Sequence, residues 1–245
     1  MKKVKINELK EFSVKALEKV GVSKQNAETV AEVLVATDVF GVVTHGTKNL
    51  CQYIEKMQAG GLDAQAEPSI VCEGLSYAII DGNKAVGMVS ACKAMELAIK
   101  KAKETGVAYV GVRNSCHFGA SGYYANMAAK EGLLGISVSN ADPIMAIPNS
   151  ARPAIGTNPF SFAVPLGDGK SLFLDCALSN VAALRPHICR SRWDCTSKRR
   201  APQLPFAYGT YRDSARRAEN SSRAKDRRSR PHQPRGIFYL PTSLY

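Results

Sequence analysis

Two histidines stand in similar short sequences, and each could carry a proton during a reaction. His117 lies in NSCHFGASGYY after an apolar run, and His45 lies in VVTHGTKNL after another. Imidazole titrates near neutral pH, so it can take a proton from a hydroxyl group and return it, as alcohol oxidation and carbonyl reduction require. A single histidine at such a place is more often structural, and the repeated H-G and H-F-G contexts add some weight to the catalytic alternative.

Cys116 and Asp175 are further candidates, each with a structural alternative. Cys116 directly precedes His117, but neighbours on an extended strand point to opposite sides, so the sequence favours a buried thiol over a Cys–His pair. Asp175 ends the strand-like run LFLD, at the kind of sheet edge where open α/β sheets bind ligands. Its carboxylate could accept hydrogen bonds from sugar hydroxyls, or it could cap the next helix.

A long segment between two predicted strands, ADPIMAIPNSARPAIGTNP, also invites a functional interpretation. It covers residues 141–159 and contains four prolines, which argue against a flexible linker. Gly156, Thr157 and Asn158 offer backbone that a ligand can approach and polar groups to meet it. The alternative is an ordered surface loop with ordinary turn chemistry.

The elements expected around these residues place both histidines at turns. Helical spacing of apolar residues predicts a helix that Asn7 can cap, a second that Ser23 can cap, and a third from about Thr47 to Met57. His45 precedes this third helix. Strand-like and helical segments then alternate: strands at 69–74, 77–82, 107–113, 133–140, 160–164 and 172–175, with helices at 86–106 and 121–132. The alternation predicts an α/β fold, with His117 between a strand and a helix.

Length and composition indicate a folded body large enough for a proper core. The chain has 245 residues, of which 45% are hydrophobic, and no stretch long enough to span a bilayer, so we expect a cytoplasmic protein with no membrane partner. Its seven cysteines show no C-x-x-C spacing, which favours reduced thiols and no metal site. It contains neither the Rossmann glycine fingerprint nor a P-loop.

The net charge of +12 is concentrated at one end of the chain. Residues 1–184 hold 18 Lys and Arg against 17 Asp and Glu, whereas residues 185–245 hold 15 against 4. The basic residue type also changes from Lys to Arg at this border, and Leu, Ile and Val become sparse. We therefore expect a disordered Arg-rich tail over 185–245.

Five motifs in order resemble the malate/L-lactate dehydrogenase family. They are GVVTHGTKNLCQYIEKMQAGGL, DGNKAVG, VRNSCHFGASGYYANMAAKEGLLGISVSNADP, GTNPFSFAVP and LFLDCALS, and the resemblance covers roughly residues 3–183. It implies an α/β fold without a Rossmann domain, use of NAD or NADP, and a homodimer. It also implies that 1–75 forms the helical part of a substrate domain and 76–184 an incomplete cofactor-binding part.

The resemblance further implies roles for individual residues. His117 matches the histidine of N-x-x-H-F-G, the candidate proton carrier at the C2 oxygen of the substrate, and His45 matches that of S-H-G. Six residues match segments that line the cofactor: Asn140, Thr157, Asn158, Pro159, Asp175 and Ser179.

The chain departs from the family at the position that sets substrate binding. Relatives often read H-G-x-x-R-L, where the arginine can hold a substrate carboxylate, and here Asn49 takes that place beside Lys48. Asn49 and Lys48 are therefore the substrate-binding candidates. Because a helix turns about 100° per residue, Lys48 cannot replace the arginine without a different backbone path.

The expected function is hydride transfer between nicotinamide and C2 of a small 2-hydroxy or 2-oxo acid. The change of composition suggests that the chain leaves the family's reading frame near Leu184, which would leave the enzyme truncated and impaired. The alternatives are an inactive remnant and a protein that binds nucleic acid through its basic tail. Any such tail should bind nucleic acid non-specifically, with a steep dependence on salt.

Overall fold

The computed structural model describes residues 4–146, 153–167 and 169–179, which fall into two compact units. The larger unit holds residues 4–141 and 158–179, and the smaller holds residues 142–146 and 153–157. The expectations for the Arg-rich tail concern residues outside these ranges. The division into residues 1–75 and 76–184 as substrate and cofactor parts stays a prediction.

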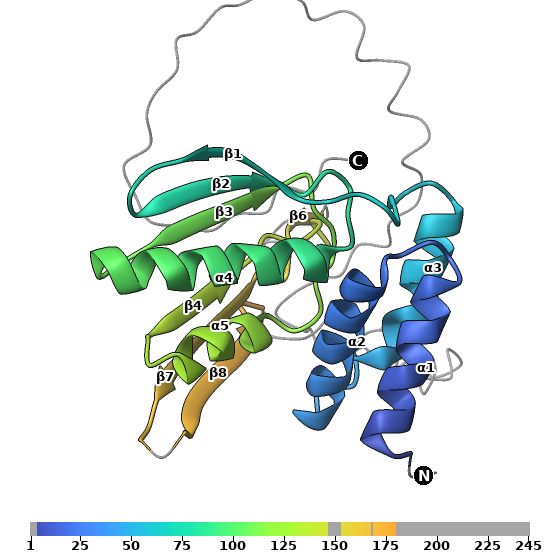
Figure 1. Ribbon diagram of the computed structural model, residues 1–245, viewed down its shortest axis with the longest axis horizontal. Helices are drawn as coiled ribbons and strands as arrows, with labels where there is room; N and C mark the ends of the chain where they lie inside the picture. The colour runs from blue at the N-terminus through green and yellow to red at the C-terminus, as the bar shows by residue number, and fades with distance from the viewer. Residues whose placement is uncertain (1–3, 147–152, 168, 180–245) are drawn as a thin grey trace, which may run out of the picture. The chain divides into compact units, whose positions relative to one another are not determined.

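The larger unit begins with a group of helices (Figure 1). They are α1 (Ile6–Glu18), α2 (Lys24–Val39), the 3-10 helix η1 (Thr47–Asn49) and α3 (Leu50–Gln58). Ser23 caps α2 as predicted, because its hydroxyl accepts a hydrogen bond from the backbone N–H of Asn26 at 3.3 Å. The predicted cap at Asn7 is wrong, since α1 begins at Ile6.

Apolar side chains at helical spacing pack together in one core between these helices. Val30, Val33 and Leu34 of α2 are fully buried, as is Leu17 of α1. The same core includes Tyr53 of α3. Burial of large apolar side chains stabilises a fold by roughly 1.5–3 kcal/mol each, so this shared core fixes α3 against α2.

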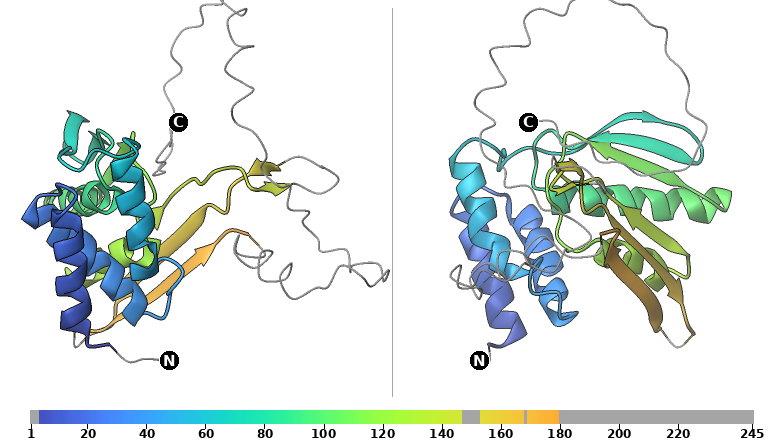
Figure 2. Two further views of the ribbon diagram at one scale, coloured as in Figure 1. Left: turned by 90° about the vertical axis from the view of Figure 1, so that its right-hand side faces the viewer. Right: turned by 180° about the vertical axis from the view of Figure 1, so that it is seen from behind.

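The first sheet consists of β1 (Ser69–Glu73), β2 (Tyr77–Asp81) and β3 (Tyr109–Arg113), in that order. β1 and β2 are antiparallel, whereas β2 and β3 are parallel and are joined through α4 (Gly87–Thr105). Figure 2 shows α4 beside this sheet, where a small apolar cluster that includes Ile80 and Val112 is buried. Parallel strands need such a crossover, and it brings the carboxyl ends of β2 and β3 to one edge.

The second sheet is antiparallel, with strand order β4 (Gly135–Val138), β7 (Pro159–Pro165) and β8 (Ser171–Ala177). Helix α5 (Ser121–Lys130) packs on it through buried Ala125 and Ala129 against Ala163. Because these side chains are small, the helix lies close to the strands. The two sheets and their helices confirm the α/β class.

A buried cluster of hydroxyl groups joins the start of α5 to the second sheet. Ser121 and Ser161 lie 2.9 Å apart through their Oγ atoms, and the two Oγ atoms lie 3.0 and 2.9 Å, respectively, from the carbonyl oxygen of Ser137. The Oγ of Ser137 is 2.9 Å from that of Ser121. These bonds satisfy three buried hydroxyls and hold the helix start in place.

The smaller unit corrects the description of residues 141–159 as one irregular loop. It contains a two-stranded antiparallel ribbon of β5 (Met145–Ala146) and β6 (Pro153–Ile155). The backbone N–H of Ile144 donates to the carbonyl of Ile155 at 3.2 Å. Pro153 begins β6 and Pro143 lies two residues before β5, so these two prolines belong to or flank an ordered ribbon.

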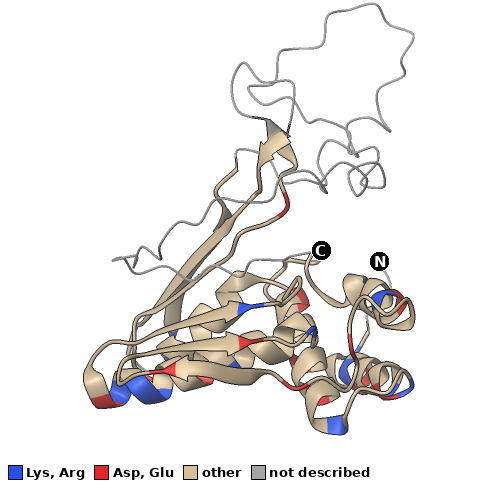
Figure 3. Ribbon diagram, turned by 90° about the horizontal axis from the view of Figure 1, so that it is seen from above, with Lys and Arg blue, Asp and Glu red and all other residues tan. Residues whose placement is uncertain are grey.

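Charge on the described residues is mixed in sign. Figure 3 shows acidic and basic residues on the same helices, with neither sign covering a whole element. None of the helices in the described ranges is long and apolar enough to cross a membrane.

Candidate active site

His45 lies half-buried on the turn between α2 and η1. The carboxylate of Asp38, in the last turn of α2, accepts hydrogen bonds from the backbone N–H of Thr47 at 3.0 Å and from its hydroxyl at 2.5 Å. Gly46 passes so close that a Cβ there would lie 1.9 Å from Asp38 Oδ1. The glycine of the H-G motif is therefore required by this close approach.

His117 lies on the loop between the end of β3 and the start of α5. The next residue, Phe118, is buried, and its ring stacks on that of Tyr124 with centroids 5.1 Å apart. Phe118 therefore anchors the loop in the core and leaves the neighbouring His117 at the surface of the site. Part of the His117 side chain is exposed to solvent.

The structure brings the two histidines together with one tyrosine. The rings of His45 and His117 are stacked, with centroids 5.4 Å apart and planes 25° from parallel. The hydroxyl of Tyr53, on α3, is 2.5 Å from Nδ1 of His117. Thr44 Oγ1 lies 2.9 Å from Nδ1 of His45. Each ring thus has a hydroxyl partner at Nδ1.

The surroundings favour the neutral form of His117. Burial lowers its pKa to about 4, and the nearby charges of His45 and Lys56 act in the same direction. His117 is exposed as a residue, but the protein packed around its ring, including His45 and Tyr53, disfavours a charge. Burial also raises the pKa of Tyr53, so its hydroxyl keeps its proton.

His45 has a different electrostatic partner. Burial lowers its pKa as well, but the carboxylate of Asp175 opposes this shift. Asp175 lies on β8, and its Oδ2 accepts a hydrogen bond from the backbone N–H of Gly122 in the first turn of α5 at 2.8 Å. The carboxylate therefore caps α5, which precedes it in the chain, and not a following helix.

Cys116 remains a half-buried thiol, as the sequence favours. Burial raises its pKa, and its Sγ accepts a hydrogen bond from the backbone N–H of Gly87 at 3.3 Å. The thiol makes no hydrogen bond with the ring of His117 in the described part of the chain. A Cys–His nucleophile is not formed here.

Five of the six cofactor candidates lie in the larger unit: Asp175, described above, and Asn140, Asn158, Pro159 and Ser179. Asn158, with φ of 39°, accepts a hydrogen bond from the backbone N–H of Ala141 at 3.0 Å through its side-chain oxygen. The carbonyl of Pro159 accepts one from Ser139 at 3.2 Å. Asn140 lies two residues after the end of β4 and Ser179 two residues after the end of β8, and both are half-buried. Thr157 belongs to the smaller unit.

Asn140 carries an unsatisfied acceptor. Its Oδ1 is buried and has no hydrogen-bond partner among the described residues. A buried amide oxygen without a donor costs roughly 1–3 kcal/mol, so such a group calls for an explanation. A ligand with an N–H group would satisfy it, and the carboxamide of nicotinamide has one. The residues present therefore fit a nicotinamide cofactor.

The substrate-binding candidates differ in what they can reach. Asn49 donates from Nδ2 to the carbonyl of Thr44 at 2.9 Å, so its side chain supports the His45 turn. Lys48 is exposed on η1. Lys56, three residues beyond Tyr53 and thus near the same side of α3, is the cation whose charge reaches His117.

Sequence reasoning did not assign a functional place to Tyr53, Asp38 or Lys56. Tyr53 falls within the helix predicted from about Thr47 to Met57, and its hydroxyl is the one signal that it could also pair with a polar partner. Asp38 lies seven residues before His45 and offered no recognisable spacing. The three contacts depend on how α2, α3 and the His117 loop pack.

The sequence profile of the malate/L-lactate dehydrogenase family matches residues 4–191. The chain belongs to this family. A malate dehydrogenase from Pyrococcus abyssi is 42% identical over 175 residues, which cover 71% of this chain and 48% of the relative. A malate/(S)-sulfolactate dehydrogenase from Methanothermus fervidus is 40% identical over 152 residues, or 62% of this chain and 45% of the relative.

The fold agrees with this assignment. The structure of malate dehydrogenase from Pyrococcus horikoshii OT3 superposes with a TM-score of 0.73 at 41% identity, covering 75% of this chain and 53% of that one. The chain thus spans about half the length of the curated relatives it matches. The likeness confirms the mixed α/β fold within the part of the chain that matches.

Proposed function

We propose that this chain is an oxidoreductase that transfers hydride between NAD or NADP and C2 of a small 2-hydroxy or 2-oxo acid. The observation that carries the proposal is the stacked pair of His45 and His117 with Tyr53 at Nδ1 of His117. The family membership and the names of the relatives, which act on malate and sulfolactate, support the substrate class.

His117 is the proposed proton carrier. Oxidation of a 2-hydroxy acid removes a hydride from C2 and a proton from its hydroxyl, and a neutral imidazole can accept that proton at Nε2. That step needs the tautomer with its proton on Nδ1, from which the Tyr53 hydroxyl can accept, whereas the backbone N–H of Gly119, 3.4 Å from Nδ1, can only donate and must then release Nδ1. The lowered pKa of His117 keeps the accepting form available at neutral pH.

His45 is the proposed second substrate contact. Its ring lies against that of His117, and burial lowers its pKa although the carboxylate of Asp175 opposes this shift. A neutral His45 that donates from its N–H group would hold the substrate oxygen while His117 takes or returns the proton. The pair would divide the work of binding and proton transfer between two rings.

Cofactor binding is proposed for the segment around Asn140. When bound, a nicotinamide cofactor supplies the chemistry of accepting or giving the hydride. The buried Oδ1 of Asn140 would accept a hydrogen bond from its carboxamide. We assign Asn158, Pro159 and Ser179 to the same contact surface from the family motifs, and Thr157, in the smaller unit, stays a separate cofactor-binding proposal from those motifs. Asp175 caps α5 in the structure, so it would lie beside the cofactor without a direct hydrogen bond to it.

Recognition of the substrate carboxylate is proposed for Lys56. Asn49 stands where relatives often have arginine, and its amide is engaged with Thr44. Lys56 brings a positive charge to the side of α3 that carries Tyr53. A lysine holds a carboxylate less rigidly than a forked guanidinium, so we expect a broader range of 2-hydroxy acids.

The test measures cofactor binding and turnover separately. Calorimetric titration of the 245-residue chain with NAD and with NADP should show binding, and Asn140→Ala should weaken it about fivefold to tenfold, the effect of one hydrogen bond. Nicotinamide absorbance then follows turnover with malate, lactate and sulfolactate. A folded chain that neither binds a cofactor nor turns over any of these acids contradicts the proposal.

The expectations for partners and for residues 185–245 also stay proposals. They are a homodimer, a cytoplasmic location, non-specific binding of nucleic acid by the tail, and a departure from the family's reading frame near Leu184 that impairs activity. The family profile ends at residue 191, within a few residues of the change in composition. Translation of the coding DNA in its other two frames past residue 184 tests the frame directly.

A further inference from the structure

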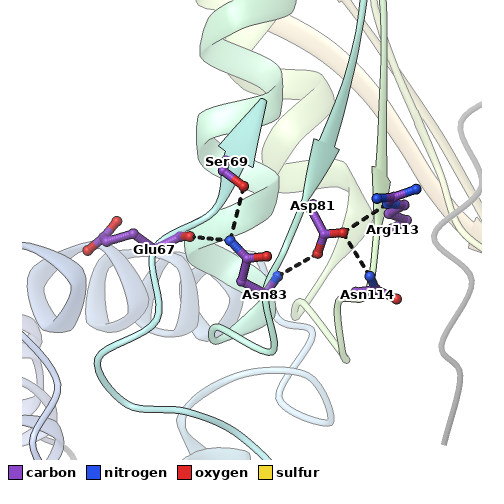
Figure 4. Close-up of polar contacts among 6 residues, drawn as sticks. All are labelled: Glu67, Ser69, Asp81, Asn83, Arg113 and Asn114. Atoms are coloured by element: carbon purple, nitrogen blue, oxygen red, sulfur yellow. Dashed lines mark hydrogen bonds and ion pairs between the residues drawn. The ribbon is translucent and has the colours of Figure 1, made fainter. Parts of the chain in front are cut away.

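The loop that carries His117 leaves the first sheet through a small polar cluster. Asp81 ends β2 and is paired with Arg113, the last residue of the parallel strand β3. Figure 4 shows the Asp81 carboxylate between the two strand ends. Its Oδ2 accepts from Arg113 Nε at 2.9 Å and from Asn114 Nδ2 at 2.8 Å, and its Oδ1 accepts from the backbone N–H of Asn83 at 2.9 Å.

The backbone at this cluster is held in an uncommon conformation. Asn83, Lys84 and Asn114 have φ of 51°, 62° and 50°, in the left-handed region that non-glycine residues rarely adopt. The two turns also bond to each other, from Gly82 N–H to the Arg113 carbonyl at 2.8 Å and from Lys84 N–H to the Asn114 carbonyl at 3.2 Å. Such a conformation persists only where surrounding contacts enforce it.

The same turn delivers α4 against the backbone of His117. Gly87 begins α4, and a Cβ there would lie 2.5 Å from the carbonyl oxygens of both Cys116 and His117. The loop is therefore fixed at two places that belong to one turn, at Asn114 by the Asp81 carboxylate and at His117 by the start of α4. A shift of the turn would move the imidazole relative to Tyr53.

We propose that Asp81, acting through Asn114, is a positioning residue for His117. The carboxylate holds Asn114 in its left-handed conformation and so sets the path of the three residues that lead to the imidazole. This inference rests on the proposed role of His117 as proton carrier. It adds Asp81 and Asn114 to the machinery as positioning residues, although neither touches the two stacked rings.

Two asparagines of the cluster provide a matched pair for the test. Asn114→Gly removes the side chain that bonds to Asp81, while glycine keeps the positive φ. Asn83→Gly likewise keeps the positive φ and the backbone bond to Asp81, but removes bonds from Asn83 Nδ2 to the Glu67 carbonyl at 2.8 Å and to Ser69 Oγ at 3.1 Å. Only the first change breaks the link toward His117.

The readout is the ring of His117, observed by nitrogen NMR of the full chain and assigned with His117→Ala. Asn114→Gly should raise the His117 pKa from about 4 toward its ordinary 6.5 and change the tautomer balance set by Tyr53. It should lower kcat about tenfold to a hundredfold with little change in KM, because misplacement of a reacting group affects the chemical step. Asn83→Gly should leave the ring titration and kcat unchanged.

Asp81→Asn is the second variant, because an amide has a single oxygen and cannot accept both from Asn83 on one side and from Arg113 and Asn114 on the other. An unchanged His117 titration in either folded variant overturns the proposal. So does failure of both variants to fold when Asn83→Gly folds, since the cluster would then serve the fold alone. The titration is independent of turnover, so it decides this inference even if no dehydrogenase activity is found.

Discussion

The His45 turn and the His117 loop have similar sequences but are built differently. The His45 turn is tied to α2 by one carboxylate, that of Asp38. The His117 loop is held by the edge of a sheet, by the start of α4 and by the buried ring of Phe118. The motif therefore marks a place for an imidazole, while packing decides how rigidly the ring is held.

The two regions also differ in charge. Asp175 favours a proton on His45, whereas Lys56 and His45 itself disfavour one on His117. Burial lowers the pKa of both rings, but His45 has a carboxylate that opposes the shift and His117 has none, so the two rings differ in how easily each takes a proton. Residues of other elements therefore set the different pKa values of two histidines that lie side by side.

The largest expected effect separates the two histidines by their chemistry. His117→Ala should lower kcat by about 100-fold to 10,000-fold, the usual contribution of a proton-transferring group, while cofactor still binds. His45→Ala should raise KM more than it lowers kcat, because its proposed role is to hold the substrate oxygen. Steady-state kinetics with calorimetric cofactor titration measure both. Equal losses of kcat in the two variants would remove the proposed division of roles.

The next effect concerns how the His45 turn is held. Asp38→Ala should lower the free energy of unfolding by about 1–3 kcal/mol, because it leaves the backbone N–H and hydroxyl of Thr47 without their acceptor. Asp63→Ala is the control, since Asp63 makes a similar bond to the backbone N–H of Gln65 at 2.9 Å on an exposed loop. Urea denaturation compares the two, and similar losses would show that the Asp38 bonds add nothing beyond an ordinary turn.

The smallest effect is on pH dependence. The folded chain binds a proton at His117 only near pH 4, whereas the unfolded chain binds one near the ordinary pKa of 6.5. This contribution to stability is therefore present above pH 6.5 and is lost as the pH falls toward 4. His117→Gln should flatten that part of the stability profile, and Lys56→Met should raise the His117 pKa slightly. An unaltered profile in His117→Gln would mean that other groups titrate there.

Much of the fold followed from local patterns. Val30, Val33 and Leu34 recur at helical spacing and are buried in α2, and Ser23 caps that helix. Phe12 shares the apolar spacing of α1 but is 65% exposed, because spacing shows which residues share a face and not what covers that face. The start of α1 was predicted wrongly because Asn7 is a common capping residue. In the structure the helix begins at Ile6, and no side chain caps it.

The site could be predicted only in part. His45 and His117 were singled out because imidazole titrates near neutral pH and both sequence contexts contain glycine. Tyr53 and Asp81 could not be assigned, since the partners they bond to lie 64 and 32 or 33 residues away. No periodicity reports such distances. The ribbon in residues 141–159 was missed because prolines and glycines punctuate it.

The buried hydroxyls of Ser121, Ser137 and Ser161 connect α5 to the second sheet through hydrogen bonds that can be arranged in more than one way. The cluster has four close oxygen–oxygen approaches, but each hydroxyl has a single proton to place among them. Several hydrogen arrangements therefore share one set of heavy-atom positions. When the charge on Asp175 at the neighbouring helix start changes, these dipoles can reorient without moving the backbone. The hydrogen bonds thus hold the oxygen atoms in place, while the hydroxyl protons can rearrange when a nearby charge changes.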